Sequence, residues 1–173
     1  MLGAMAIAIG LAAAPLAAQG GDPMTKATKG WFDVVKGYIT KSAEQVSEAN
    51  YAFKPTPEVR SFGQLIGHVA DSNYEICSAA AGEKPPVNDV EKTKTAKADL
   101  QKALAESFAY CDKVWAGVTD AKGTEMVKFF GGQQPRLAVL GFNTSHDFEH
   151  YGNIVTYMRL KGMVPPSSQR GGM

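Results

Sequence analysis

The sequence predicts an all-α protein built as a bundle of four helices. Four long segments carry apolar residues at the three- and four-residue spacing of one helix face. No stretch alternates apolar and polar residues for long enough to require a strand, and no segment repeats another. The 173 residues, 45% of them hydrophobic, suffice for one buried core and are too few for two ordinary domains. Helices of about 20–27 residues are the size that packs as a four-helix bundle.

The first expected helix follows Pro23, and its apolar stripe comprises Trp31, Val34, Val35, Tyr38, Ile39 and Val46. The aromatic residues Trp31, Tyr38, Phe108 and Trp115 are expected in the core. Residues 50–57, with two prolines, end the helical pattern. The second expected helix begins at Ser61, which forms a capping box with Gln64, and ends at Gly82.

Two polar connections separate the remaining helices. Residues 83–94 form the first, and the charged stretch 91–97 is interpreted as a solvated helix entry. The third helix carries the apolar stripe Leu100, Leu104, Phe108, Cys111, Trp115 and Val118. Residues 123–134 are expected to be irregular, after which Pro135 fits the first turn of a long fourth helix that stops at Gly162. Residues 21–166 therefore form the expected domain, and residues 167–173 a disordered tail.

The N-terminal segment, residues 1–20, resembles a signal peptide. It is apolar, contains no charged residue, and ends in small residues that fit cleavage near Ala18. One alternative is an uncleaved membrane anchor, which the weak hydrophobicity of the segment disfavours. The other is a buried N-terminal helix, which Pro15 and the helix-breaking residues 19–23 disfavour. We therefore expect a periplasmic or secreted protein that has no stable membrane anchor after cleavage.

Charge and cysteine content exclude several classes of protein. The 18 basic and 17 acidic residues nearly cancel, which leaves no electrostatic footprint for nucleic acid or an anionic membrane. Two cysteines are too few for a cysteine-rich zinc module or a dense disulfide framework. We therefore expect no nucleic-acid partner.

The three histidines are the candidate metal ligands. His146 and His150 are four residues apart, which places both imidazoles on one face of the fourth helix, while His68 lies in the second helix. The glutamate of an HExxH motif is absent. Polar residues at helical spacing from these histidines are candidate partners for their second ring nitrogens: Asp71, Asn143, Asp147 and Asn153. Three imidazoles would leave a coordination position open, as in catalytic sites. Histidine pairs at this spacing also arise by chance on solvated helices, so the pattern alone leaves both interpretations open.

Two segments resemble the DinB/YfiT-like superfamily. Residues 145–153 (SHDFEHYGN), 157–162 (YMRLKG) and Pro165-Pro166 resemble its last helix, and residues 60–71 (RSFGQLIGHVAD) resemble the helix with its first metal-ligating histidine. The resemblance spans residues 24–166. It implies His68, His146 and His150 as ligands of a divalent ion, usually zinc or nickel. It also implies an up-down-down-up bundle, with residues 83–94 as the crossover between parallel second and third helices. The family's Arg-Gly-Gln is Tyr151-Gly152-Asn153 here, and Glu149 replaces a histidine that many members carry.

In the implied parallel arrangement, Cys77 and Cys111 lie at the same level of the second and third helices. In an antiparallel hairpin they would be offset by about 16 Å, too far for a disulfide. Export to an oxidising compartment favours a Cys77–Cys111 disulfide, and two buried free thiols are the alternative.

The resemblance implies a metal-dependent hydrolase or a thiol-dependent transferase acting on an unknown small molecule. Asp71, Asp147 and Glu149 are the candidate general bases. One alternative is a non-catalytic periplasmic bundle that binds a metal or a small ligand, and another is a structural bundle with a vestigial site. A homodimer is also compatible with the sequence.

Overall fold

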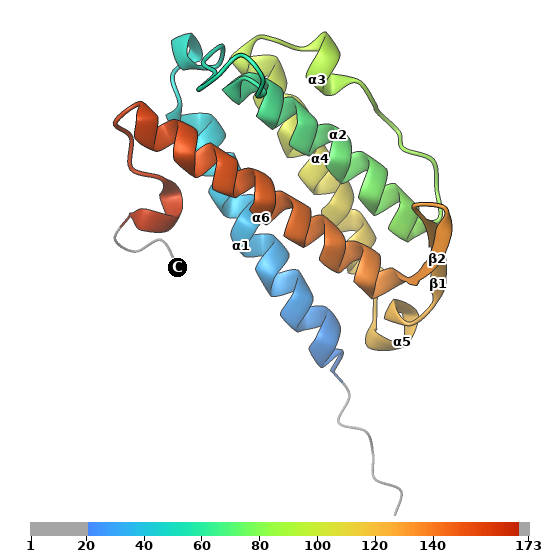
Figure 1. The fold of residues 1–173 in the computed structure, drawn as a ribbon. Coiled ribbons are helices and arrows are strands. Elements are labelled where there is room, and N and C mark those ends of the chain that lie inside the picture. The colour runs from blue at the N-terminus through green and yellow to red at the C-terminus, as the bar shows by residue number, and fades with distance from the viewer. Residues whose placement is uncertain (1–20, 170–173) are drawn as a thin grey trace, which may run out of the picture.

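Four long helices make up most of the protein in the computed structural model, which describes residues 21–169 (Figure 1). The signal-peptide-like segment 1–20 and residues 170–173 lie outside the described residues. The long helices are α1 (Pro23–Gln45), α2 (Phe62–Ala81), α4 (Lys97–Ala116) and α6 (Arg136–Leu160). The expectation of a mainly helical protein is therefore confirmed.

Side-chain contacts give the directions in which these helices run. The α2–α4 contacts Asn73–Ser107 and Cys77–Cys111 share one sequence offset, so the two helices run in the same direction. On α6, Tyr157 donates to the Arg60 carbonyl, whereas Arg136 donates to the carbonyl of Ala80 at the other end of α2. The α6 helix therefore runs antiparallel to α2, and α1 packs mainly against α6.

A short hairpin is the main departure from the expected all-α fold. The strands β1 (Met126–Phe129) and β2 (Gly132–Pro135) pair in antiparallel register within the segment that was expected to be irregular. The turn between them is possible because Phe130 and Gly131 both have positive φ angles, 46° and 77°. The other short elements are η1 (Glu48–Asn50), α3 (Val90–Thr93), α5 (Asp120–Gly123) and η2 (Pro166–Ser168).

The ends of α2 agree with the prediction, whereas the ends of α6 differ from it by one or two residues. Ser61 and Gln64 form both hydrogen bonds of the capping box, and Gly82 ends α2 in the left-handed conformation. Pro135, however, is the last residue of β2 and the N-cap of α6, not part of its first turn. The last residue of α6 is Leu160, two positions before Gly162.

The buried face of α1 differs from the predicted apolar stripe at one position, where Phe32 is buried in place of Trp31. Trp31 is 63% exposed, whereas its neighbour Phe32 is fully buried. The Phe32 ring lies 5.9 Å from the ring centre of Phe108 and 6.0 Å from that of Trp115, so it fills the space between α1 and α4. Successive helix positions differ by about 100°, so a small rotation of α1 decides which aromatic residue is buried.

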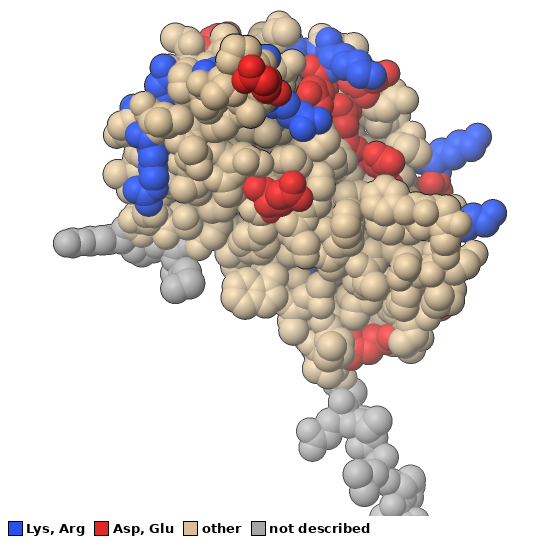
Figure 2. Space-filling view, in the orientation of Figure 1, with Lys and Arg blue, Asp and Glu red and all other residues tan. Residues whose placement is uncertain are grey.

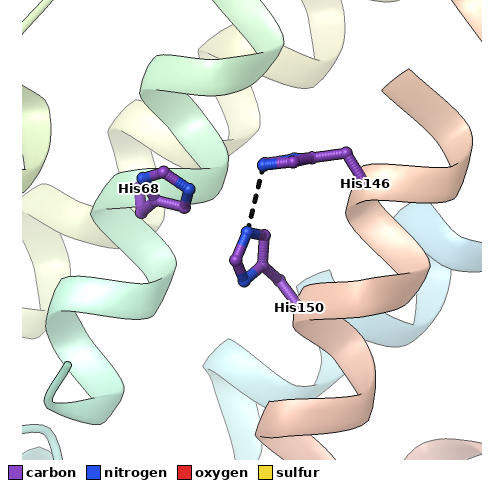
Figure 3. Close-up of side chains that lie close together, drawn as sticks. All are labelled: His68, His146 and His150. Carbon is purple, nitrogen blue, oxygen red and sulfur yellow. Dashed lines mark hydrogen bonds between the residues drawn. The ribbon is translucent and has the colours of Figure 1, made fainter. Parts of the chain in front are cut away.

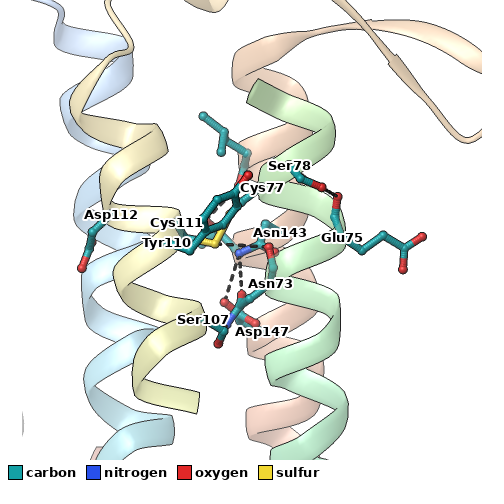
Figure 4. Close-up of a disulfide and its surroundings, with 12 residues drawn as sticks. Asn73, Glu75, Cys77, Ser78, Ser107, Tyr110, Cys111, Asp112, Asn143 and Asp147 are labelled. Atoms are coloured by element: carbon teal, nitrogen blue, oxygen red, sulfur yellow. Dashed lines mark hydrogen bonds between the residues drawn. A yellow bond between two sulfur atoms is a disulfide. The ribbon is translucent and has the colours of Figure 1, made fainter. Parts of the chain in front are cut away.

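The expected disulfide between Cys77 and Cys111 is present, with the two Cα atoms 5.4 Å apart (Figure 4). A buried polar cluster lies beside it, between α2, α4 and α6. Asn73 donates to Ser107 (3.3 Å), and Asn143 donates to the Oδ1 atom of Asn73 (3.0 Å). These hydrogen bonds hold three helices together at the level of the disulfide.

The first residues of the expected disordered tail are ordered against α6. Ser167 donates its backbone N–H to the Tyr151 hydroxyl, which in turn donates to the Ser167 hydroxyl. Arg159 donates to the Ser168 hydroxyl, and residues 166–168 form a 3-10 helix, so residues 167 and 168 are ordered although they belong to the predicted tail 167–173. Among the described residues, no helix combines the length and the apolarity needed to cross a bilayer.

Candidate metal centre

The three histidines converge between α2 and α6 (Figure 3). One ring nitrogen from each of His68, His146 and His150 lies within 4.8 Å of the others. The Nε2 atoms of His146 and His150 are only 3.0 Å apart. The His68 ring centre is 5.3 Å from that of His146 and 4.6 Å from that of His150.

Local helix geometry produces this convergence. His146 and His150 lie one turn apart on α6, so their side chains leave the helix on the same face. His68 lies in the second turn of α2, which packs antiparallel to α6. All three sequence-predicted metal ligands are therefore brought together.

The surroundings of the three histidines favour uncharged imidazole rings, the form that binds metal ions. Burial, together with the charges of the neighbouring histidines, lowers the pKa of His150 to about 3. Burial also lowers the pKa values of His68 and His146. The Arg60 guanidinium acts in the same direction on all three histidines, because a nearby cation disfavours a protonated ring.

Glu91 is the outer partner that sequence reasoning missed. Its Oε2 atom lies 3.2 Å from Nδ1 of His68, and its Oε1 atom accepts a hydrogen bond from Arg60. A carboxylate that accepts from Nδ1–H fixes the ring and leaves Nε2 with its lone pair free. Glu91 belongs to the stretch interpreted as a solvated helix entry, and that interpretation is wrong for this residue.

Asp71 positions Glu91 instead of contacting a histidine. Its two carboxylate oxygens accept the backbone N–H groups of Val90 (2.8 Å) and Glu91 (2.9 Å). These bonds fasten the start of α3 to the side of α2. The sequence signal for this contact was the carboxylate of Asp71, one turn after His68, followed by a polar crossover. The sequence could not pair Asp71 with Glu91, however, because that pairing depends on where the crossover passes.

The other predicted outer partners are placed differently. Asn143 and Asp147 face the buried polar cluster and donate or accept within it, while Asn153 is exposed. No hydrogen bond in the described part of the chain joins these three residues or Asp71 to a histidine ring. Burial raises the pKa of Asp147 well above its usual value.

A cleft of about 700 Å³ opens beside His150. Arg60 and Glu91 border it from the α2 side, and Glu149 and Asn153 border it from α6. Of the three candidate bases, only Glu149 lies at this cleft, because Asp71 is engaged with backbone N–H groups and Asp147 is fully buried.

The donor set fits a divalent transition-metal ion. Imidazole is a preferred ligand of zinc and nickel, and two ring nitrogens that face each other at 3.0 Å can share one cation. The Nδ1 atoms of His146 and His150 are buried without a hydrogen-bond partner, so protein groups do not compete for these rings.

Comparisons with known proteins agree on one family. The sequence profile described as DinB superfamily matches residues 32–154. The uncharacterized protein YjoA of Bacillus subtilis (strain 168) is 25% identical over 123 residues, which are 69% of this chain and 79% of YjoA.

Solved structures show the same fold. A DinB-like protein from Bacillus cereus ATCC 10987 superposes with a TM-score of 0.72 at 16% identity, covering 82% of this chain and 95% of that protein. The DinB-like YjoA of Bacillus subtilis gives 0.66 at 21% identity, with coverage of 80% and 94%. A conserved protein from Enterococcus faecalis gives 0.64 at 18%, with coverage of 79% and 95%.

Proposed function

The chain belongs to the DinB superfamily, and we propose that it is an exported member that binds one zinc or nickel ion through His68, His146 and His150. The convergence of three imidazole nitrogens from two helices is the observation that carries this proposal. The lowered pKa values of the histidines support it, because metal ions bind the neutral ring.

We also infer that the four long helices form the up-down-down-up bundle that the family resemblance implies. The common direction of α2 and α4 supports this arrangement. The passage of residues 83–94 along α2, fastened by Asp71, supports their role as the crossover. Export is supported by the apolar segment before Asp22 and by the disulfide, which forms in oxidising compartments.

The cleft beside His150 supports a catalytic function for the site, as a hydrolase or a transferase. A divalent ion held there would supply a Lewis acid beside the cleft. Arg60 is placed to bind an anionic or carbonyl group of a small substrate, because the residue lines the cleft and its side chain is 41% exposed. Glu149 is the acid–base group best placed to hold or accept a proton. A non-catalytic metal or ligand binder is the second candidate.

Metal analysis tests the proposal. The chain purified without chelator is expected to contain close to one zinc or nickel ion and to melt at a higher temperature than the chelator-treated protein. His146→Ala should lose the ion and keep its helical circular dichroism, whereas the exposed control Ser145→Ala should retain both. A chain without metal that is not stabilised by added zinc or nickel would contradict the site and, with it, the metal-dependent activity.

Substrate turnover separates the two candidates. A screen of esters, amides and thiol-transfer reactions on the metal-loaded protein should yield a rate that falls in His68→Ala without unfolding. A metal-loaded protein that binds a compound from the screen without turnover would favour the binder.

A further inference from the structure

We infer that aromatic side chains of the β1–β2 hairpin and of α6 form an apolar subsite beside the metal centre. This subsite would hold the aromatic or acyl part of a small substrate whose polar end reaches the metal ion. The inference rests on the proposed metal site and adds the class of substrate.

The subsite consists of Phe129, Phe130 and Phe142, which we call the aromatic cluster. The ring centres of Phe129 and Phe130 are 4.1 Å apart, and the Phe142 ring centre lies 5.3 Å from the first and 5.5 Å from the second. Phe142 also stacks on His146, with ring centres 6.4 Å apart. The aromatic cluster is therefore continuous with a proposed metal ligand.

The aromatic cluster is open to solvent. Phe130 is 76% exposed and Phe142 is 40% exposed, so their rings are not part of the core. Charged side chains crowd the upper part of the face in Figure 2, and a broad uncharged surface lies below them, over α6 and toward the hairpin. An apolar group placed on these rings would lose water from both surfaces, which favours binding.

Phe130 occupies its position against two local preferences. Its φ of 46° is left-handed, a conformation that Asn and Gly adopt far more readily than a bulky aromatic residue, and Gly131 follows it in the same turn. Phe130 also gains little from burial, since the residue is 76% exposed. A residue that neither favours the turn nor fills the core is expected to have a binding role.

Polar groups on the other side of the histidines define the rest of the substrate. Arg60 and Glu149 border the cleft beside His150, while the aromatic cluster adjoins His146. A molecule with one apolar end and one polar, metal-binding end would match both sides. The aromatic cluster, which comprises three rings, suits a single ring or a short acyl chain.

Paired metal-binding probes test this inference on the zinc-loaded protein. Acetohydroxamic acid and 3-phenylpropanohydroxamic acid share the metal-binding group and differ in the apolar tail. Titration calorimetry should give about tenfold tighter binding of the phenyl probe, because burial of part of a ring contributes at that level. Phe130→Asn and Phe142→Ala should each reduce this preference several-fold.

The matched control is Trp31→Ala, which removes another exposed aromatic ring that has no ring contact with the aromatic cluster among the described residues. It should leave the preference unchanged. Phe130→Asn should also melt at a higher temperature than the parent, because Asn suits the turn.

Three outcomes would overturn the inference: an equal affinity of the parent for both probes, a preference that survives both phenylalanine variants, or a concentration-dependent dimer that Phe130→Asn dissociates. Each of these would be seen with one zinc ion still bound per chain. Loss of zinc from the parent itself would instead reject the metal site, and the subsite with it.

Discussion

Nδ1 of His68 lies 3.2 Å from Oε2 of Glu91, although the two residues are on different segments and 23 positions apart. The link is built in two steps, because Asp71 holds the backbone of Glu91 and Glu91 then reaches the ring. The orientation of a proposed metal ligand therefore depends on the crossover between α2 and α4.

Glu91→Gln is expected to weaken metal binding about 10- to 100-fold, as loss of a carboxylate partner of a ligating histidine does. The neutral amide is a poorer acceptor for Nδ1–H and no longer pairs with the Arg60 cation. Competition with a chromophoric chelator measures the affinity. Glu106→Gln, at an exposed position on α4, is the control. Equal affinities of the two variants would show that Glu91 does not support the site.

Gly67→Ala should disturb the same link from the α2 side. A Cβ atom at Gly67 would lie 2.7 Å from Cα and 3.0 Å from the backbone N of Glu91, closer than atoms pack. We expect the free energy of unfolding to fall by about 1–3 kcal/mol, with weaker metal binding, because the crossover must move. Urea denaturation with metal titration measures both effects.

Gly152→Ala is the matched substitution on α6. Nothing lies within 4 Å of a Cβ atom there, so alanine should raise the free energy of unfolding by up to about 1 kcal/mol through helix propensity alone. A destabilised Gly152→Ala together with a neutral Gly67→Ala would contradict this view of the two positions.

The sequence predicts the parts of the fold that local interactions determine. Ser61 and Gln64 set the start of α2 and Gly82 its end, because these residues satisfy backbone groups within one turn of the helix. The spacing of His146 and His150 likewise fixes their common face. The disulfide became predictable only once the resemblance supplied the direction of the helices.

The missed features depend on contacts distant in sequence. Burial of Phe32 in place of Trp31 follows from how α1 rotates against Phe108 and Trp115. Each strand of the hairpin has only four residues, too few for an alternating pattern that would predict a strand. Glu91 is one of several charged residues in its stretch, and its contact with His68 depends on the path of the crossover between α2 and α4.

The stability of the metal-free protein should fall as the pH drops below about 6.5, where unfolded histidines begin to bind protons. Burial lowers the pKa of folded His150 to about 3, so between these values the unfolded chain binds more protons than the folded one. The midpoint of urea unfolding, measured from pH 8 to pH 4 with chelator present, should decrease. His150→Gln should show a shallower decrease, and an equally steep one would argue against this cause.

Asp147→Asn should stabilise the protein, and the gain should grow as the pH rises above about 4, the ordinary pKa of Asp. Asp147 is fully buried, its pKa is raised, and its Oδ1 atom has no hydrogen-bond partner. Above that pH the unfolded carboxyl releases its proton more readily than the folded one, which favours unfolding. Thermal melting at pH 5 and pH 8 compares the variants. A variant less stable than the parent at pH 8 would indicate that the carboxylate is needed.

Replacing Cys77 and Cys111 together by alanine should lower the free energy of unfolding by about 3–4 kcal/mol, the entropic contribution of closing a loop of this length. Metal stoichiometry should be unchanged, since the disulfide does not contact the histidines. Denaturation in urea and metal analysis of the double variant provide the two readouts. Loss of the ion from a variant that remains folded would show that the disulfide also supports the site.

The position of that disulfide along the chain has a consequence for the order of folding. The ring of chain that it closes contains Glu91 but none of the three histidines. In the oxidised chain α2, the crossover and α4 are already tethered, so the carboxylate is near His68 before α6 arrives. Assembly of the site then depends mainly on the docking of one helix, and oxidised protein should regain metal binding faster than reduced protein after dilution from urea.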